Sequence, residues 1–200
     1  MTLDVISAST EISFALAELA RDVGRSVVLV RGSMGSSGSG VIWDQPGLIV
    51  TNHHVVPGPS AQVTVLGGRR FSARVVRRAP ALDLAALAVE ADLAAEASRV
   101  GDSDALRVGD LVMAVGNPMG ERNAPSLGIL ASAPHDVLRL AITLRPGNSG
   151  GALVNARGEV VGIPHMVTGS GLALAVASQT VRRFLEGDTG EVDDADLRWI

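Results

Sequence analysis

One serine in this sequence stands in a turn that favours nucleophilic chemistry. Ser149 lies in the segment 145–151, RPGNSGG, with glycines on both sides and apolar runs before and after it. Glycine lets the backbone bend sharply and leaves neighbouring N–H groups uncovered by side chains. A hydroxyl beside free N–H donors suits acyl transfer, because the donors can stabilise an oxyanion. The turn therefore predicts a nucleophilic serine.

Two upstream segments supply candidate partners for this serine. His53 and His54 stand in the segment 51–56, TNHHVV, and Asp83 opens the segment 83–87, DLAAL. The order His, Asp, Ser is that of the chymotrypsin-type triad, and not of subtilisin or the α/β-hydrolases. On a strand the two histidines would point to opposite faces, so only one could face a cleft. The same geometry makes them a poor metal pair, and we predict no metal site.

Three absent residue types narrow the chemistry. The chain has no Cys, no Tyr and no Lys, so all 17 of its basic residues are Arg. A thiol nucleophile, a disulfide and a Ser–Lys dyad are thereby excluded, since arginine stays protonated and cannot act as a base. The remaining bases are a carboxylate or one of the four histidines, which are His53, His54, His135 and His165.

Charge and hydropathy exclude other classes of function. The net charge of −4 argues against nucleic acid as the main partner. No apolar run approaches 18 residues, so we expect no membrane span. The first residues lack the basic and apolar regions of a signal peptide, which predicts a cytoplasmic protein or a chain that begins after a removed leader.

Short apolar runs predict an all-β protein. Apolar residues make up 46% of the chain, which is enough for a sizeable core. Their regular spacing between Gly, Pro and Asp is typical of antiparallel barrels or sandwiches. The predicted strands are 26–30, 40–43, 48–50, 62–66, 73–76, 84–89, 111–115, 127–130, 138–144, 152–155, 160–163 and 172–176.

Helices are predicted only near the two ends. An amphipathic pattern indicates a helix over 11–24, with Ser9 or Thr10 as its cap, and a closing helix over 179–185. Residues 187–200 read as an acidic, mobile tail. The strands divide near 99–109, which separates His54 and Asp83 from Ser149, so a shared site would lie in the cleft between two halves.

With these segments identified, residues 25–185 resemble the HtrA/Deg serine proteases, a branch of the chymotrypsin-fold clan. The segments that carry the resemblance are GSGVI (38–42), LIVTNHHVV (48–56), DLAALAV (83–89), AVGNPMG (114–120), GILAS (128–132), PGNSGGAL (146–153), GEVVGI (158–163) and GLALAV (171–176). The resemblance implies two six-stranded antiparallel β-barrels of the trypsin-like fold. The implied units are an N-terminal helical segment (1–24), barrel one (25–105), barrel two (109–178), a closing helix (179–186) and the tail (187–200).

The resemblance also implies a role for each candidate site residue. By motif position His54 is the general base, Asp83 orients it and Ser149 is the nucleophile. The oxyanion hole falls on Gly147, Asn148 and Ser149. No cofactor is implied.

A substrate pocket follows by the same comparison. Thr143 takes the position of the pocket base, and Leu144, His165, Met166 and Val167 wall the pocket and the strand that would pair with substrate. Because no Asp stands at the base, we expect a small or medium aliphatic P1 residue.

Three positions and the length of the C-terminal segment differ from the family pattern, and these differences lead to further expectations. Position 53 is His where the family often has Asn, and position 164 is Pro, which donates no N–H to a paired substrate. Asn148 replaces the Asp that trypsin-type zymogens pair with a cut N-terminus, so we expect control by ordering of the loop and not by cleavage. The residues after the closing helix are too few for the PDZ domain that relatives carry.

The resulting prediction is a serine endopeptidase of unfolded or extended polypeptides, working through an acyl-enzyme in protein quality control. The alternative is a binding or chaperone-like module whose oxyanion loop rests in an inactive form. An esterase activity would be secondary. Relatives commonly form trimers through N-terminal segments, so a homo-oligomer is a further expectation.

Overall fold

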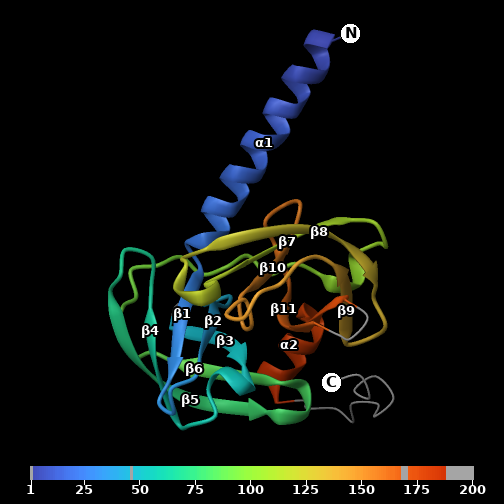
Figure 1. Cartoon of the computed structure of the whole chain (residues 1–200). Helices are drawn as coiled ribbons and strands as arrows, with labels where there is room; N and C mark the ends of the chain where they lie inside the picture. Colours follow the sequence, from blue (N-terminus) through green and yellow to red (C-terminus); the bar gives the residue numbers. More distant parts are fainter. Residues whose placement is uncertain (1, 46, 168–170, 188–200) are drawn as a thin grey trace.

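Two β-barrels and two helices form the part of the chain that the structure, a computed structural model, describes: residues 2–45, 47–167 and 171–187. Side chains of 2–6 and 166–167 are outside this description, and so is the predicted acidic tail beyond Gly187. Figure 1 shows the two barrels side by side, with α1 leading away from them and α2 packed against them.

The first barrel closes in the order β1-β2-β3-β6-β5-β4 and the second in the order β10-β11-β12-β9-β8-β7, all antiparallel. The strands of the first barrel are β1 (Val27–Gly32), β2 (Ser37–Ile42), β3 (Leu48–Asn52), β4 (Ser60–Thr64), β5 (Arg70–Ala79) and β6 (Leu84–Ala88). Those of the second are β7 (Leu111–Gly116), β8 (Ala124–Ser132), β9 (Val137–Ala141), β10 (Ala152–Asn155), β11 (Val160–Val167) and β12 (Ala173–Ala177).

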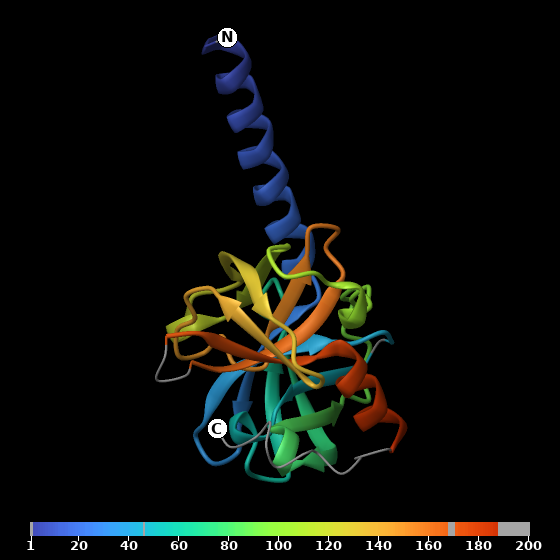
Figure 2. The same ribbon diagram turned by 90° about the vertical axis from the view of Figure 1, so that its right-hand side faces the viewer.

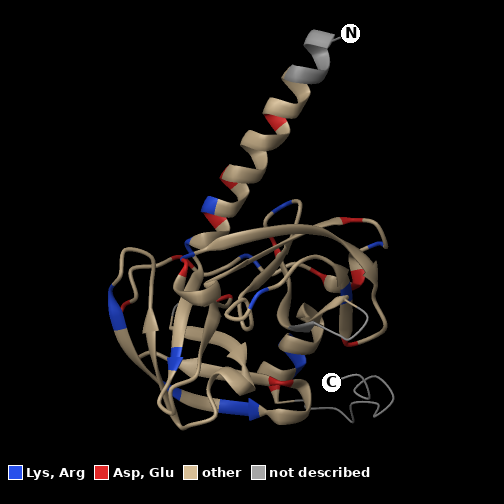
Figure 3. Ribbon diagram, viewed as in Figure 1, with Lys and Arg blue, Asp and Glu red and all other residues tan. Residues whose placement is uncertain are grey.

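These strands confirm the predicted fold class, and they decide for barrels over sandwiches. Each of the twelve predicted runs overlaps one observed strand. Closure removes unpaired sheet edges, and it leaves one face of each strand inside a barrel and the other outside. Figure 3 shows residues of both charge signs distributed along the ribbons of both barrels.

Three apolar clusters explain how the barrels stay together. One fills the first barrel around Ile42, Ile49 and Leu87, and another fills the second around Leu130 and Leu153. The third lies between the barrels and draws on both: its largest members are Trp43, Leu84, Met113, Ile163 and Phe184. Burial of this shared cluster holds the two barrels in a fixed relationship, which any site made from both of them requires.

Helix α1 (Thr2–Gly24) begins nine residues earlier than the predicted start at 11, so the prediction of Ser9 or Thr10 as its cap was wrong. No Gly or Pro interrupts residues 2–23, so nothing in the backbone stops the helix from continuing toward the N-terminus. Only its last turns touch the body, and Figures 1 and 2 show the rest projecting away from the barrels.

The C-terminal end of α1 is tied to the second barrel. The side-chain amide of Asn123 donates to the carbonyl of Gly24 at 2.8 Å, while Leu16 and Leu19 pack against the shared cluster. Helix α2 (Ser178–Glu186) closes the chain as predicted and buries Val181 and Phe184. Both helices therefore seal the seam between the barrels.

Candidate active site

The histidine and aspartate segments meet because of the register between β3 and β6. Asn52, the last residue of β3, lies opposite Leu84, the first residue of β6. The chain leaves β3 into a short 3-10 turn, His53–Val55, and Asp83 immediately precedes β6. His54 and Asp83 are therefore neighbours at the same end of two paired strands.

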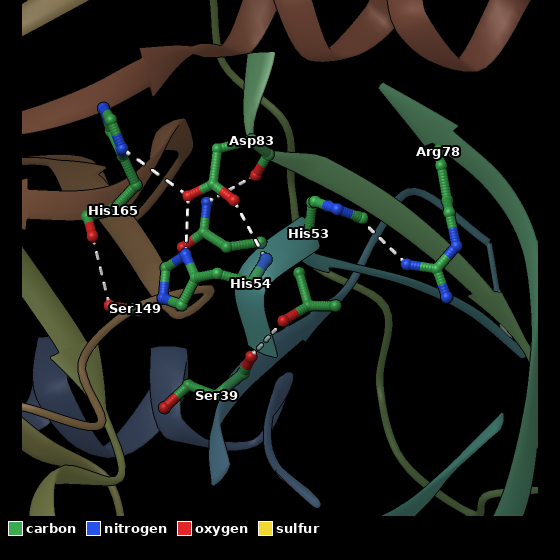
Figure 4. Close-up of polar contacts among 9 residues, drawn as sticks. Ser39, His53, His54, Arg78, Asp83, Ser149 and His165 are labelled. Atoms are coloured by element: carbon green, nitrogen blue, oxygen red, sulfur yellow. Dashed lines mark hydrogen bonds and ion pairs between the residues drawn. The ribbon is translucent and has the colours of Figure 1, made fainter. Parts of the chain in front are cut away.

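Asp83 holds His54 through both of its carboxylate oxygens. The backbone N–H of His54 donates to Oδ1 at 3.0 Å, and Nδ1 of its ring lies 2.7 Å from Oδ2 (Figure 4). Asp83 adopts a left-handed conformation with φ 50°, which aspartate tolerates better than most residues. The Nδ1 contact favours the tautomer that carries its proton on Nδ1 and leaves Nε2 free to act as a base.

The electrostatics of this pair favour an ionised carboxylate. Burial alone would raise the pKa of Asp83, but the imidazoles of His165 and His54 and the N–H of His54 outweigh it. Together they hold the pKa of Asp83 well below its usual 3.8. His165 Nδ1 lies 3.6 Å from Asp83 Oδ2, beyond ordinary hydrogen-bond distance, so we regard its influence as chiefly electrostatic. Asp83 is thus negative at neutral pH.

His53 faces away from this pair. The expectation that the two histidines alternate along a strand was wrong, because both lie in the 3-10 turn. The N–H of His53 donates to the carbonyl of Asp83 at 2.9 Å, but only the imidazole of His54 contacts the Asp83 carboxylate at hydrogen-bond distance. His53 Nδ1 lies 3.0 Å from the guanidinium of Arg78. Arg78 also donates to the carbonyls of Val56 (2.5 Å) and Gly58. A single arginine of β5 therefore clamps the loop that carries His54.

The serine turn leaves two backbone donors free. Gly147 has φ 103°, and the carbonyl of Pro146 accepts the N–H of Met119 at 3.2 Å. Since the peptide between Pro146 and Gly147 is trans, its N–H points the opposite way from this carbonyl. Among the described residues, the N–H groups of Gly147 and Ser149 make no hydrogen bond. Asn148 differs, because its N–H donates to the carbonyl of Arg145 at 3.0 Å and is not available to a substrate.

Ser39 of β2 fastens this turn to the first barrel, a role that sequence reasoning missed. Its buried hydroxyl donates to the carbonyl of Gly147 at 2.7 Å and accepts the N–H of Asn117 at 2.7 Å. Its backbone N–H donates to the carbonyl of Ser149 at 2.8 Å. The serine within the GSG motif was the available signal, but Asn117 and Gly147 lie 78 and 108 residues away in the chain.

Ser149 lies beside His54 in Figure 4, at the junction of the barrels. Its hydroxyl donates to the carbonyl of His165 at 3.2 Å. The structure thus brings together His54, Asp83 and Ser149 with two unoccupied N–H donors. Such a group can abstract a proton, deliver a nucleophile and stabilise an oxyanion at one point.

The predicted pocket residues are brought together less fully. Thr143 is exposed, and Leu144 packs against the interior of the second barrel. The side chain of His165 is buried against Asp83 and does not line an open pocket, which corrects the role predicted for it. Met166 and Val167 extend β11, and their side chains lie outside the described residues.

Two features are absent from the described residues. No cluster of three or more His, Asp or Glu side chains in these ranges has the geometry of a metal site. Neither described helix has the length and apolarity needed to cross a bilayer.

Comparison with known proteins gives consistent matches. The family model for the trypsin-like peptidase domain matches residues 38–163. The chain is 37% identical over 171 residues to the serine protease Do-like HtrA of Lactobacillus helveticus, covering 73% of this chain and 41% of that protein. It is 37% identical over 163 residues to the periplasmic serine endoprotease DegP of Salmonella typhimurium, covering 74% of this chain and 34% of that protein.

A solved structure shares the fold. The HtrA-type protease AlgW with tripeptide superposes with a TM-score of 0.79 at 29% identity, covering 85% of this chain and 62% of that one. The chain thus spans about two fifths or less of the length of these two curated relatives.

Proposed function

Because this chain belongs to the trypsin-like peptidase family, with a protease domain of the HtrA type, we propose that it is a serine endopeptidase. The observation that carries the proposal is the pair of unoccupied N–H groups at Gly147 and Ser149, next to a hydroxyl and an Asp-bound imidazole. A binding module would have no need to keep two backbone donors free at that point.

In the proposed reaction His54 acts as the base. Its Nε2 takes the proton of Ser149 Oγ while the oxygen attacks the scissile carbonyl carbon. The resulting oxyanion accepts hydrogen bonds from the N–H groups of Gly147 and Ser149. The His54 imidazolium, stabilised by Asp83, then protonates the departing amine, which leaves an acyl-enzyme. Water, deprotonated by the same imidazole, hydrolyses the ester and restores the serine.

The resting hydroxyl must turn before it reacts. Ser149 Oγ donates to the carbonyl of His165, and attack requires it to donate to His54 Nε2 instead. A rotation about one side-chain bond accomplishes this change, and a substrate seated against β11 would favour it. The turn at Gly147 needs no such change, since its N–H makes no hydrogen bond to any described residue. Control by loop conformation, and not by N-terminal cleavage, remains our proposal on the ground that Asn148 cannot form the ion pair of trypsin-type zymogens.

The proposed substrates are unfolded or extended polypeptides, which fits a role in protein quality control. The pairing of β10 with β11 ends at Gly162, and the carbonyl of Pro164 accepts the N–H of Gly150 at 3.0 Å. We therefore propose that an extended segment joins β11 at residues 165–167, beyond this contact. Main-chain pairing of this kind excludes folded substrates, because their backbones are already paired. We also propose a small or medium aliphatic P1 residue, because by family position Thr143, and not an Asp, takes the place of the pocket base.

Covalent labelling separates this proposal from the alternative of a binding module. We expect a fluorophosphonate to label the wild type and leave Ser149→Ala unlabelled, with Ser33→Ala labelled like the wild type. Cleavage of a fluorescently labelled unfolded protein should fall by about 10³-fold or more in Ser149→Ala. Binding of that protein without any label at Ser149 would favour the binding module. A peptide library preferring Arg or Lys at P1 would contradict the proposed pocket.

A further inference from the structure

Asn117 is a buried asparagine that joins the second barrel to the first. It directly follows β7 and is 4% exposed, and its side-chain amide donates to the carbonyl of Val28 in β1 at 3.0 Å. The segment AVGNPMG (114–120) contains it, but the reaction proposed above gives it no part. A buried amide is costly to leave unsatisfied, so the partners of this one indicate what it does.

The orientation of the Asn117 amide is fixed by those partners. Its Oδ1 accepts the N–H of Asn123 at 3.3 Å, while Nδ2 donates to the carbonyl of Val28. An amide turned over would set its oxygen against the carbonyl of Val28 and its NH2 group against the N–H of Asn123, and both contacts would be repulsive. Nδ2 is therefore the atom that faces the first barrel.

Two donors of Asn117 converge on the hydroxyl of Ser39. The backbone N–H donates to Ser39 Oγ at 2.7 Å, and Nδ2 donates its second hydrogen to the same oxygen at 3.2 Å. A serine hydroxyl has one proton to donate and two lone pairs with which to accept. Because both lone pairs face donors, the proton must go to a third partner, which is the carbonyl of Gly147 at 2.7 Å. Asn117 thus decides where the Ser39 hydroxyl points.

The direction of this hydroxyl matters because Gly147 has no side chain to limit its conformation. The peptide before it is held at the carbonyl of Pro146 by the N–H of Met119, and the peptide after it is held at its own carbonyl by Ser39. A glycine at φ 103° reaches other conformations at little cost. Without the Ser39 proton, the peptide between Gly147 and Asn148 can rotate, and the proposed oxyanion N–H groups lose their common direction.

We propose that Asn117 is a positioning residue, which aims the Ser39 hydroxyl at Gly147 and so keeps the two oxyanion N–H groups convergent. It acts on the tetrahedral intermediate without touching the substrate. This inference rests on the proposed protease function, because an oxyanion forms only if Ser149 attacks a carbonyl. Loss of Asn117 should therefore weaken the binding of an oxyanion and leave the binding of an intact peptide unchanged.

Asn117→Asp is the sharpest substitution, because it keeps the shape of the side chain and replaces the Nδ2 donor with an acceptor. The Ser39 proton can then turn to the new carboxylate and leave Gly147. We expect kcat for a peptide substrate to fall about 10- to 100-fold, while KM changes by less than about 2-fold. A peptide aldehyde, which forms a tetrahedral adduct with Ser149, should bind more weakly by the same factor as kcat falls.

The corresponding peptide alcohol is the control ligand, because it forms no adduct. It should bind Asn117→Asp as it binds the wild type. Equal weakening of the aldehyde and the alcohol would mean that Asn117 only supports the fold, and it would overturn the proposal.

A double-mutant cycle tests the route through Ser39. If Asn117 acts on the turn through this hydroxyl, Ser39→Ala combined with Asn117→Asp should lose no more kcat than Ser39→Ala alone. Losses that multiply would contradict the proposal. Asn155→Asp is the matched control, because the buried side chain of Asn155 holds the turn between β10 and β11 and not the serine turn. Its kcat should stay within about 2-fold of the wild type, although its stability should fall.

Because a buried carboxylate can prevent folding, Asn117→Ala is the second variant. It removes only the side-chain donor, and kcat should fall about 3- to 10-fold. In the inactive Ser149→Ala background, the carbonyl carbon-13 resonance of Gly147 should shift in Asn117→Ala in the same direction as in Ser39→Ala. An unchanged resonance would overturn the inference. A wild type without fluorophosphonate labelling would defeat the proposed function, whereas the carbon-13 result stands or falls independently.

Discussion

The hydroxyl of Ser39 donates to the carbonyl oxygen of Gly147 at 2.7 Å, so a strand of the first barrel holds the turn that carries the proposed oxyanion N–H groups. The same hydroxyl accepts the N–H of Asn117. The orientation of the Gly147 peptides therefore depends on contacts made across the interface between the barrels.

Ser39→Ala should loosen this turn without removing any group that contacts the substrate. We expect kcat/KM to fall about 10- to 100-fold, since the oxyanion donors lose their fixed direction. The unpaired carbonyl and N–H should also lower the free energy of unfolding by about 1–3 kcal/mol. Peptide hydrolysis and denaturant titration measure the two effects. Ser26→Ala is the matched control, because the buried hydroxyl of Ser26 donates to the carbonyl of Val23 and not to the serine turn. Equal losses in both variants would argue against a specific role for Ser39.

Gly147→Ala should abolish the oxyanion turn. A Cβ at this position would lie 2.7 Å from the carbonyl oxygen of Asn117 and 2.8 Å from Pro118 Cα, at a φ of 103° that alanine disfavours. We expect at least about a 100-fold loss of kcat, measured with a peptide substrate. Gly35→Ala is the control, because it introduces a similar backbone strain, at a φ of 88°, while its added Cβ meets no atom within 4 Å. Full activity in Gly147→Ala would contradict the assigned donors.

Asp83→Asn tests the orienting carboxylate through pH. Because the pKa of Asp83 is lowered in the folded protein, its ionisation stabilises the fold above the unfolded pKa of about 4 and loses this effect as pH falls toward the folded pKa. The wild type should therefore melt higher than Asp83→Asn at pH 6, and the difference should shrink below about pH 4. At neutral pH, kcat should fall about 10³- to 10⁴-fold. Asp44→Asn, an exposed change, should match the wild type, and a pH-independent difference in melting would count against the pairing.

Arg78→Ala should free the loop that carries His54. Arg78 contacts His53 and two loop carbonyls, so its loss should lower kcat and the melting temperature together. Arg78→Lys should recover only part of the lost kcat and melting temperature, since an ammonium group cannot reproduce the planar set of guanidinium donors. Arg74→Ala on the same strand removes only an exposed ion pair with Glu90, and we expect a stability change within about 0.5 kcal/mol. Calorimetry and peptide hydrolysis distinguish these cases.

The projecting part of α1 exposes two large apolar side chains, which supports a proposal of self-association. Ile12 and Phe14 are 61% and 68% exposed on a helix that projects from the barrels. We expect a trimer by light scattering, and we expect Ile12→Asp with Phe14→Asp to yield monomers whose cleavage of short peptides persists. Ser13→Asp, which lies between them, should remain trimeric. A monomeric wild type at micromolar concentration would refute the proposal.

The strand pattern was predictable because barrel strands bury alternating or continuous apolar runs, and each of the twelve runs has its strand. The arrangement of the site was less predictable from the sequence. His53 and His54 lie in a 3-10 turn, since the pairing of β3 with β6 stops at Asn52. The position of the His165 side chain could not be predicted, because a bulge in β11 decides where it points. Ser39 has partners distant in sequence, and no local pattern identifies such contacts.

The shared cluster around Trp43 and Phe184 has a consequence for dividing the chain into two fragments. The proposed base and carboxylate stand on the first barrel and the nucleophile on the second, joined by the connection from 89 to 110. Two fragments cut within that connection would each lack a complete reaction centre. Labelling of Ser149 by a fluorophosphonate would then occur only after the two fragments reassemble. The fold could therefore serve as a split-protein reporter of association.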